Sequence, residues 1–210
     1  VAGLGVARTF QNLALSPHIT VADTLLLGRH RLTRAGFLAS GLRLPSAARE
    51  AARHRARVEE IAEFTGLDRY LDRPAATLPY GLQKLAELAR ALCMEPRLLL
   101  LDEPVAGMTA DERRRTAAVI AGVRDSLGIS LVLVEHDMGM VMRLADAVTV
   151  LDFGRRIADG HPDDVRRDPA VIRAYLGEAS TDDEEAQDDG DGEDSGTPDK
   201  SNRTGTQEAP

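Results

Sequence analysis

The chain has 210 residues, 43% of them hydrophobic, which is enough for one domain with a substantial core. Its formal charge of −8 is uneven: from Glu178 onward twelve acidic residues stand against two basic ones, so the preceding part carries a net of +2. That near-neutral part lacks the broad basic character of nucleic-acid binders, and its apolar runs are too short to span a bilayer. We therefore expect neither a nucleic-acid partner nor direct membrane insertion.

The first third of the chain is predicted to be helical. After the turn at Ser16–Pro17, a short helix is expected with Thr20 as its N-cap. A long helix is expected with Ser46 as its N-cap and Gly66 as its stop, and His54 is placed on its solvated polar face. The apolar positions of this long helix form one stripe, made of Val58, Ile61, Ala62 and Leu67.

A third amphipathic helix is predicted from about Gly81 to the residues before Pro96. It places Cys93, the only cysteine, on an apolar face, where a buried structural thiol is expected. Its apolar residues recur with helical spacing at Leu85, Leu88, Ala89 and Leu92.

Strands and helices alternate in the remainder. Two apolar runs, 98–101 and 129–134, predict strands buried on both faces, and the helix between them is expected to be capped by Thr109 or Asp111. The next expected elements are a helix over 136–145, a strand over 147–152 and a turn into a short strand at 156–160. Two short helices are expected to start near Pro162 and Pro169. This order predicts an α/β fold with a parallel sheet.

The segment from Glu178 to Pro210 has a different composition. It contains no aliphatic residue larger than alanine and no aromatic residue, so it cannot bury enough surface to offset the entropy of ordering. We interpret residues 178–210 as a disordered acidic tail. Its simplest role is that of a solvated, solubilising segment, and a specific acidic-tail function is the alternative.

Polar residues follow two of the predicted strands directly. Asp102 and Glu103 end the first strand, and Glu135, His136 and Asp137 end the second. In open parallel sheets, ligands bind beyond the carboxyl ends of the strands. A nucleoside triphosphatase fits this pattern: Asp102 would hold Mg²⁺, Glu103 would orient or deprotonate the attacking water, and His136 would contact the γ-phosphate.

Order and spacing strengthen this interpretation, since 21 positions separate Gly81 from Asp102 and 34 separate Asp102 from His136. At these distances the sequence resembles the ATP-binding subunits of ABC transporters. LPYGLQKLAELARAL resembles the signature helix of the family, LLLLDEP its Walker B strand and LVLVEHD its switch-histidine strand. Phe10–Gln11 in RTFQNLALSPHITV resembles the loop whose glutamine senses magnesium and contacts the membrane subunit. Within this family, the sequence further resembles the branched-chain amino acid importer class. The segments that carry this resemblance are RTFQN, the tyrosine of LPYG, EPVAGM, EHDMGMVM and DPAVIRAYLG.

The resemblance implies a site and its ligands. ATP and Mg²⁺ are the implied cofactors, with Tyr80, Gly81, Gln83 and Gln11 as nucleotide-binding residues and Gln11 beside Asp102 at the metal. Glu103 and His136 are the implied catalytic residues.

The resemblance also implies an architecture and partners. The fold would be a P-loop NTPase-like parallel sheet, with residues 1–177 as a partial ATP-binding domain and a helical subdomain at about 20–95. A second ATP-binding subunit would complete a head-to-tail dimer on transmembrane permease subunits. The chain would then be peripheral, at the cytoplasmic face of the plasma membrane.

Several features depart from the family pattern. The phosphate-binding loop, Gly-x-x-x-x-Gly-Lys-Ser/Thr, does not occur within the 210 residues, and neither of the two lysines, Lys84 and Lys200, follows a glycine. In the family this loop lies several dozen residues upstream of the glutamine, so we expect a domain without its N-terminal strands, which alone binds and hydrolyses ATP poorly. Pro79 stands at the signature serine, Leu82 at a usual glutamine, and Thr109 at a usual aspartate or asparagine.

Three interpretations remain open from the sequence. The chain is the C-terminal part of a working ATPase that energises import of branched-chain amino acids or similar small polar solutes. Alternatively, it is a degenerate, non-hydrolysing fragment of such a protein. The third interpretation is a soluble ABC ATPase unconnected with transport, or an interaction module.

Overall fold

The structure is a computed structural model that describes residues 4–9, 15–33 and 45–175. Gln11 and the predicted tail therefore lie outside the described residues. The chain divides into two compact units, Val1–Val148 and Thr149–Pro210, and each is described by itself. The prediction of one domain over residues 1–177 with a helical subdomain at about 20–95 stays a prediction.

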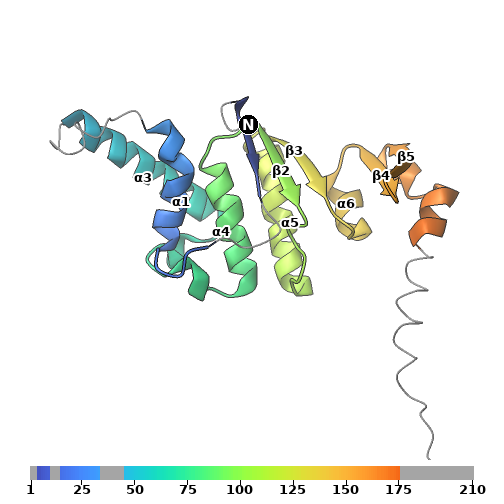
Figure 1. The fold of residues 1–210 in the computed structure, drawn as a ribbon, viewed down its shortest axis with the longest axis horizontal. Helices are drawn as coiled ribbons and strands as arrows, with labels where there is room; N and C mark the ends of the chain where they lie inside the picture. Colours follow the sequence, from blue (N-terminus) through green and yellow to red (C-terminus); the bar gives the residue numbers. More distant parts are fainter. Residues whose placement is uncertain (1–3, 10–14, 34–44, 176–210) are drawn as a thin grey trace, which may run out of the picture. The chain divides into compact units, whose positions relative to one another are not determined.

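The first unit contains a three-stranded parallel sheet (Figure 1). Its strands are β1 (Val6–Arg8), β2 (Leu98–Asp102) and β3 (Ser130–Val134), in the order β1-β2-β3. Leu98 pairs with Val6 on one side and with Ser130 on the other. The predicted α/β fold with a parallel sheet is thus confirmed. The sequence did not indicate β1, because three residues are too few to show a strand period.

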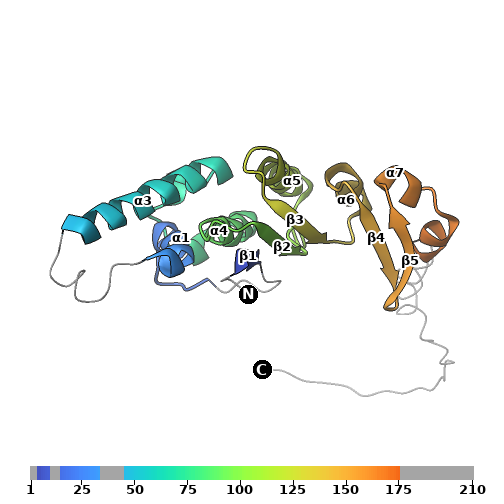
Figure 2. The ribbon, with the colours of Figure 1, turned by 90° about the horizontal axis from the view of Figure 1, so that it is seen from above.

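Within the described residues, five α-helices belong to the same unit. They are α1 (Val21–Arg29), α3 (Pro45–Thr65), α4 (Tyr80–Leu92), α5 (Ala110–Asp125) and α6 (Met138–Leu144). Short 3-10 helices lie in the described connections: η2 (His30–Leu32), η3 (Asp68–Tyr70) and η4 (Ala75–Thr77). In Figures 1 and 2, α4 lies between α1 and the sheet. It packs against α1, α3 and α5 and also contacts β1, so it is the central element of this unit.

This central place explains the burial of α4. The predicted stripe of Leu85, Leu88, Ala89 and Leu92 is buried, as expected from its helical period. Lys84 and Glu87 are also buried, with only 6% and 2% of their surface exposed. Because α4 has neighbours on several sides, burial extends beyond the stripe that hydrophobic periodicity marks.

The prediction that both strands 98–101 and 129–134 are fully buried was wrong. In β2, Leu99 and Leu101 are buried, but Leu98 and Leu100 are only half-buried. In β3, Val132 is 49% exposed and Val134 is 57% exposed. Successive side chains of a strand point to opposite faces. The face of β3 that carries these valines is therefore not covered by the part of the chain that the structure describes.

The predicted helix ends are largely as expected. Thr20 caps α1, and its Oγ1 accepts the Asp23 N–H at 3.1 Å. Gly66 follows α3 at φ 73°, the left-handed conformation that favours glycine. Of the two candidates for α5, Thr109 is the N-cap. The prediction that Ser46 caps the long helix was wrong, since Ser46 lies inside α3, which already includes Pro45.

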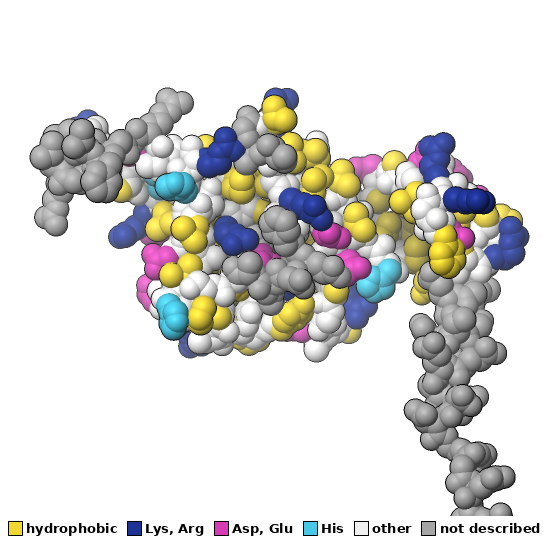
Figure 3. All heavy atoms as spheres, in the orientation of Figure 1, with side chains coloured by type: hydrophobic (Ala, Val, Ile, Leu, Met, Phe, Trp, Pro, Cys, Tyr) yellow, Lys and Arg dark blue, Asp and Glu magenta, His cyan; other side chains and the backbone are white. Residues whose placement is uncertain are grey.

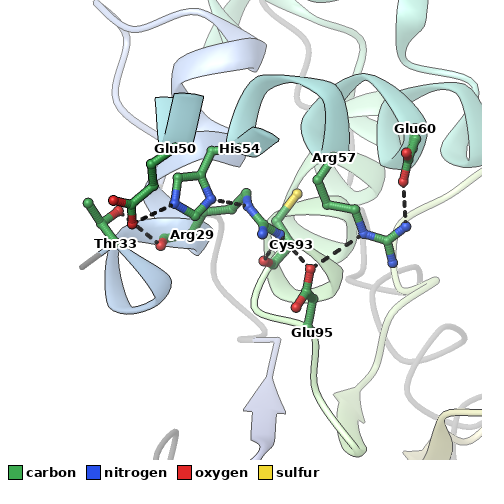
Figure 4. Close-up of polar contacts among 8 residues, drawn as sticks. All are labelled: Arg29, Thr33, Glu50, His54, Arg57, Glu60, Cys93 and Glu95. Atoms are coloured by element: carbon green, nitrogen blue, oxygen red, sulfur yellow. Dashed lines mark hydrogen bonds and ion pairs between the residues drawn. The ribbon is translucent and has the colours of Figure 1, made fainter. Parts of the chain in front are cut away.

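The prediction for His54 was also wrong (Figure 4). Its side chain is 12% exposed and lies in a polar network between α1, α3 and the segment after α4. The His54 Nδ1 accepts the Nε–H of Arg29 at 2.7 Å. Arg29 also donates from Nη1 to the Cys93 carbonyl oxygen at 3.1 Å and to Glu95 Oε1 at 3.0 Å. The Arg29 guanidinium at the end of α1 thus contacts His54 on the polar face of α3, and this part of the face is largely buried.

The network lies beside the predicted structural thiol. Cys93 is buried, and burial raises the pKa of its thiol to about 12 in spite of the nearby Arg29. A thiol with this pKa stays protonated and unreactive at neutral pH. The expectation of a buried structural cysteine is therefore confirmed.

In the second unit, the described residues form a hairpin and short helices. β4 (Val148–Asp152) and β5 (Arg155–Gly160) form a two-stranded sheet, and Phe153 and Gly154 connect them at positive φ. α7 (Pro162–Val165) follows, and residues 169–175 form a further helical segment. β4 and β5 pair with each other. A two-residue turn makes this local pairing geometrically easy.

The surface of the first unit is mixed in character. On the face drawn in Figure 3, basic, acidic and apolar side chains are interspersed. No helix among the described residues is long and apolar enough to cross a membrane.

Candidate functional site

The two predicted clusters of polar residues lie at the same edge of the sheet. Asp102 is the last residue of β2 and pairs with Val134, the last residue of β3. The Glu103 N–H donates to the Val134 carbonyl oxygen at 2.9 Å, which extends the pairing by one residue. Because the strands are parallel and adjacent, Glu103 and the segment 135–137 both leave the sheet at its carboxyl edge.

Asp102 already has a cationic partner. Its Oδ2 accepts from Arg8 Nη2 at 2.9 Å, and the two side chains are 30% and 54% exposed. An ion pair with this exposure is weak, contributing roughly 0 to 1 kcal/mol. The contact uses one carboxylate oxygen of Asp102, and the predicted role of this residue as a metal ligand stays a prediction.

Glu103 has an unusual backbone conformation. Its φ is 45°, in the left-handed region that costs a residue with a side chain roughly 1 kcal/mol or more. Pro104 follows, and the Ala106 N–H donates to the Glu103 carbonyl oxygen at 3.3 Å. The chain thus turns sharply directly after β2, so that Glu103 stands at the start of a tight loop rather than in the strand.

Glu135 and His136 differ greatly in exposure. The Glu135 side chain is 1% exposed, whereas the His136 side chain is 77% exposed. Glu135 Oε1 accepts the Val105 N–H at 3.2 Å, and Oε2 accepts the His136 N–H at 3.2 Å. A histidine held by its backbone with its ring in solvent can act on a ligand placed at this edge of the sheet.

Asp137 has a structural role next to the histidine. It caps α6 by accepting the Met140 N–H at 2.9 Å, and its Oδ2 accepts from Arg113 Nη1 of α5 at 2.9 Å. The hydrogen bond from Arg113, with help from that of Met140, holds the pKa of Asp137 below its usual value. Asp137 therefore ties the loop that carries His136 to two helices.

The start of α4 packs on the loop that follows β2. A Cβ atom on Gly107 would lie 3.3 Å from the ring of Tyr80, and one on Gly81 would lie 2.6 Å from Glu112 Oε1. Hydrogen bonds from Thr109, with a smaller one from the Gly81 N–H, lower the pKa of Glu112. A carboxylate of α5 thus lies at the N-terminus of α4, where the helix dipole favours negative charge.

Gln83 is engaged within its own neighbourhood. Its Nε2 donates to the carbonyl oxygens of Ala76 at 3.1 Å and Leu78 at 2.7 Å. These bonds hold the segment that leads into α4. The predicted contacts of Gln83 and of Gln11 with a nucleotide stay predictions, and Gln11 lies outside the described residues.

The donor set fits a metal that arrives with a nucleotide. Within 4–9, 15–33 and 45–175, no group of three or more His, Cys, Asp or Glu residues could hold a metal ion. Magnesium in nucleotide sites typically takes one or two carboxylates and completes its octahedron with phosphate oxygens and water. Asp102 offers a carboxylate of this kind, and Glu103 lies next to it.

Three neighbouring residues were not identified as functional candidates by sequence reasoning. Arg8 could not be placed without β1, and Glu112 had no signal beyond its capping position. Glu135 was noted only as a strand-end acid, although its position next to His136 could have indicated a supporting role.

The family model described as "ABC transporter" matches residues 2–106, and that described as "Branched-chain amino acid ATP-binding cassette transporter" matches residues 155–181. The high-affinity branched-chain amino acid transport ATP-binding protein BraF of Pseudomonas aeruginosa is 40% identical over 179 residues. LivG of Escherichia coli K12, which carries the same description, is 37% identical over 179 residues. Each alignment covers 85% of this chain and 70% of the relative.

The fold comparison agrees with the sequence comparison. The crystal structure of the ADP conformation of MJ1267, an ATP-binding cassette of an ABC transporter, aligns with a TM-score of 0.66 at 28% identity. That alignment covers 84% of this chain and 70% of MJ1267. A nucleotide-free ATP-binding cassette aligns with a TM-score of 0.65 at 27% identity, covering 83% of this chain and 69% of the other. Motif order, fold and relatives together show that the chain belongs to the ATP-binding proteins of the ABC transporter family.

Proposed function

We propose that the chain is an ATP-binding, ATP-hydrolysing subunit that energises an importer for branched-chain amino acids or similar small polar solutes. The observation that carries the proposal is the parallel register that ends β2 at Asp102 opposite Val134 of β3. This register brings Glu103 and His136 to one edge of the sheet. The relatives BraF and LivG, both described as branched-chain amino acid transport proteins, support the solute class.

The proposed chemistry is in-line attack of water on the γ-phosphate of ATP. Bound Mg²⁺ supplies charge that neutralises the phosphate oxygens. Asp102 would hold the metal through its carboxylate. Glu103 orients the attacking water and takes up its proton, while the exposed ring of His136 donates a hydrogen bond at the γ-phosphate.

The proposed partners follow from the same site. The N-terminus of α4, at Tyr80 and Gly81, would face the nucleotide bound by a second ATP-binding subunit in a head-to-tail dimer. Gln11 would report to a transmembrane permease subunit. The chain would then act as a peripheral protein at the cytoplasmic face of the plasma membrane.

The test introduces Glu103→Gln at the chromosomal locus, so that the transporter is assembled from its natural parts. We expect uptake of radiolabelled leucine, isoleucine and valine to be lost. ATP hydrolysis by the purified assembly should fall by about two orders of magnitude or more, while ATP binding persists. The matched control is Glu60→Gln, since Glu60 is an exposed carboxylate of α3 whose side chain is 61% exposed. Equal hydrolysis and uptake in wild type and Glu103→Gln would refute the proposal.

A second candidate function is that of a non-hydrolysing subunit. It is favoured by Pro79 at the start of α4 and by the Glu112 carboxylate next to Gly81, where the phosphate of a partner's nucleotide would bind. This candidate predicts uptake that is insensitive to Glu103→Gln. The same pair of variants therefore distinguishes the two functions.

A further inference from the structure

Glu135 is the buried carboxylate of the candidate site. It follows β3 directly, and 1% of its side chain is exposed. Its two oxygens accept from different segments: Oε1 from the Val105 N–H and Oε2 from the His136 N–H, each at 3.2 Å. One side chain thus joins the loop after β2 to the loop after β3.

Hydrogen bonds shape the loop after β2, among them one from the Met108 N–H to the Val105 carbonyl oxygen at 3.2 Å. The loop starts at Glu103 in a left-handed conformation, which a residue with a side chain adopts only when its surroundings enforce it. The Glu103 N–H is held by the Val134 carbonyl oxygen, and the Ala106 N–H by the Glu103 carbonyl oxygen. The donor of the bond to Glu135, the Val105 N–H, lies between Glu103 and Ala106 in the sequence, and its acceptor belongs to the residue directly after β3. Glu135 therefore fixes the turn in which Glu103 stands.

The loop after β3 is held by the same group. The ring of His136 is 77% exposed, so packing does little to fix it, and its Nδ1 lies 3.8 Å from Glu135 Oε2. On the far side, Asp137 is fixed by Arg113 and by the start of α6. His136 thus stands between two anchored carboxylates, and Glu135 is the one that also contacts the Glu103 loop.

We propose that Glu135 is a positioning residue that sets Glu103 and His136 relative to each other. It acts through the Val105 and His136 amides and does not touch the reacting atoms. This inference rests on the proposed function, because positioning matters for catalysis only if Glu103 and His136 act on a nucleotide. The proposed role requires two acceptor oxygens on the side chain at position 135, one for each amide. A carboxylate has two such oxygens, whereas a carboxamide has one.

Two variants distinguish the effect of the length of the side chain at position 135 from the effect of its number of acceptor oxygens. Glu135→Gln keeps the length but offers one acceptor, so one of the two amides must lose its partner. Glu135→Asp keeps both acceptors and the charge but is one methylene shorter, so it can retain His136 and lose Val105. Glu60→Gln again serves as the matched control.

The first measurement is amide hydrogen exchange by NMR on the 210-residue chain. We expect exchange at Val105 or His136 to rise about tenfold or more in Glu135→Gln, and at Val105 in Glu135→Asp, because a lost hydrogen bond favours local opening. The amides of Leu99 and Leu101 in β2 should exchange as in wild type, which shows that the variant remains folded. Unchanged exchange at Val105 and His136 in Glu135→Gln overturns the inference.

The second measurement is ATP hydrolysis by the assembly purified from the chromosomal variants. We expect Glu135→Gln to lower kcat at least tenfold while KM for ATP stays within about twofold. Raised amide exchange with an unchanged kcat makes the contact merely structural and overturns the positioning role. If wild type and Glu103→Gln hydrolyse ATP equally, the proposed function fails instead, and the exchange measurement alone shows whether Glu135 joins the two loops.

Discussion

Replacement of Arg29 by methionine tests the polar network between α1, α3 and the segment after α4 (Figure 4). The Arg29 side chain is 9% exposed and makes three hydrogen bonds, to His54 Nδ1, the Cys93 carbonyl oxygen and Glu95 Oε1. Methionine keeps much of the apolar stem of arginine but removes every donor. The variant therefore reports on the hydrogen bonds with little loss of packing.

The expected cost follows from the exposure of each partner. The Cys93 carbonyl oxygen and His54 Nδ1 are left without their donor, and each unsatisfied buried group costs about 1 to 3 kcal/mol. Glu95 is 47% exposed, so water hydrates its carboxylate and the lost ion pair adds less than about 1 kcal/mol. We expect a loss of about 3 kcal/mol in the free energy of unfolding. For a chain of this size, that corresponds to a Tm lower by about 6 to 12 °C.

The assay is thermal and urea unfolding followed by circular dichroism, with Arg57→Met as the control. Arg57 lies in the same network, but its side chain is 33% exposed and its partners Glu60 and Glu95 are 61% and 47% exposed. Its replacement should therefore cost less than about 1 kcal/mol. A loss below about 1 kcal/mol for Arg29→Met, or equal losses for the two variants, would show that burial does not set the strength of this network.

Three further predictions concern other parts of the chain. The pKa of Asp137 is lowered mainly by Arg113, so the contribution of Asp137 to stability is present at neutral pH and is lost as the pH falls through that lowered pKa. In urea titrations at pH 7, wild type should exceed Asp137→Asn by about 1 kcal/mol in the free energy of unfolding. This difference should close below about pH 4. Truncation after Gly177 should leave the Tm within about 2 °C of wild type by calorimetry, since the removed residues contain little that can be buried; a larger drop would mean that the tail docks. The polypeptide of residues 1–210 alone should show no ATP hydrolysis in a phosphate-release assay, because it contains no Gly-Lys-Ser/Thr loop; turnover that disappears in Glu103→Gln would contradict this.

Much of the site's arrangement could be predicted from the sequence. Apolar runs that end in acids placed Asp102, Glu103 and His136 at strand ends, and a parallel sheet brings such ends to one edge. These inferences depend on local periodicity and chain order, which a sequence displays directly. The inward stripe of α4, the cap at Thr20 and the stop at Gly66 were predictable for the same reason.

The tertiary structure decided which side chains meet across long sequence distances. The sequence assigned His54 to solvent, but Arg29, 25 residues earlier, makes it an interior acceptor. Arg8 reaches Asp102 from a strand too short to be predicted, and Glu135 reaches Val105 across 30 residues. The apolar run also predicted that β3 is buried on both faces. The burial of a strand depends on which elements cover each face, and only the packing of the elements decides this. The residue type and the hydrophobic periodicity show which face of a helix or strand a side chain occupies. The partner that the side chain contacts is set by how the helices and strands pack.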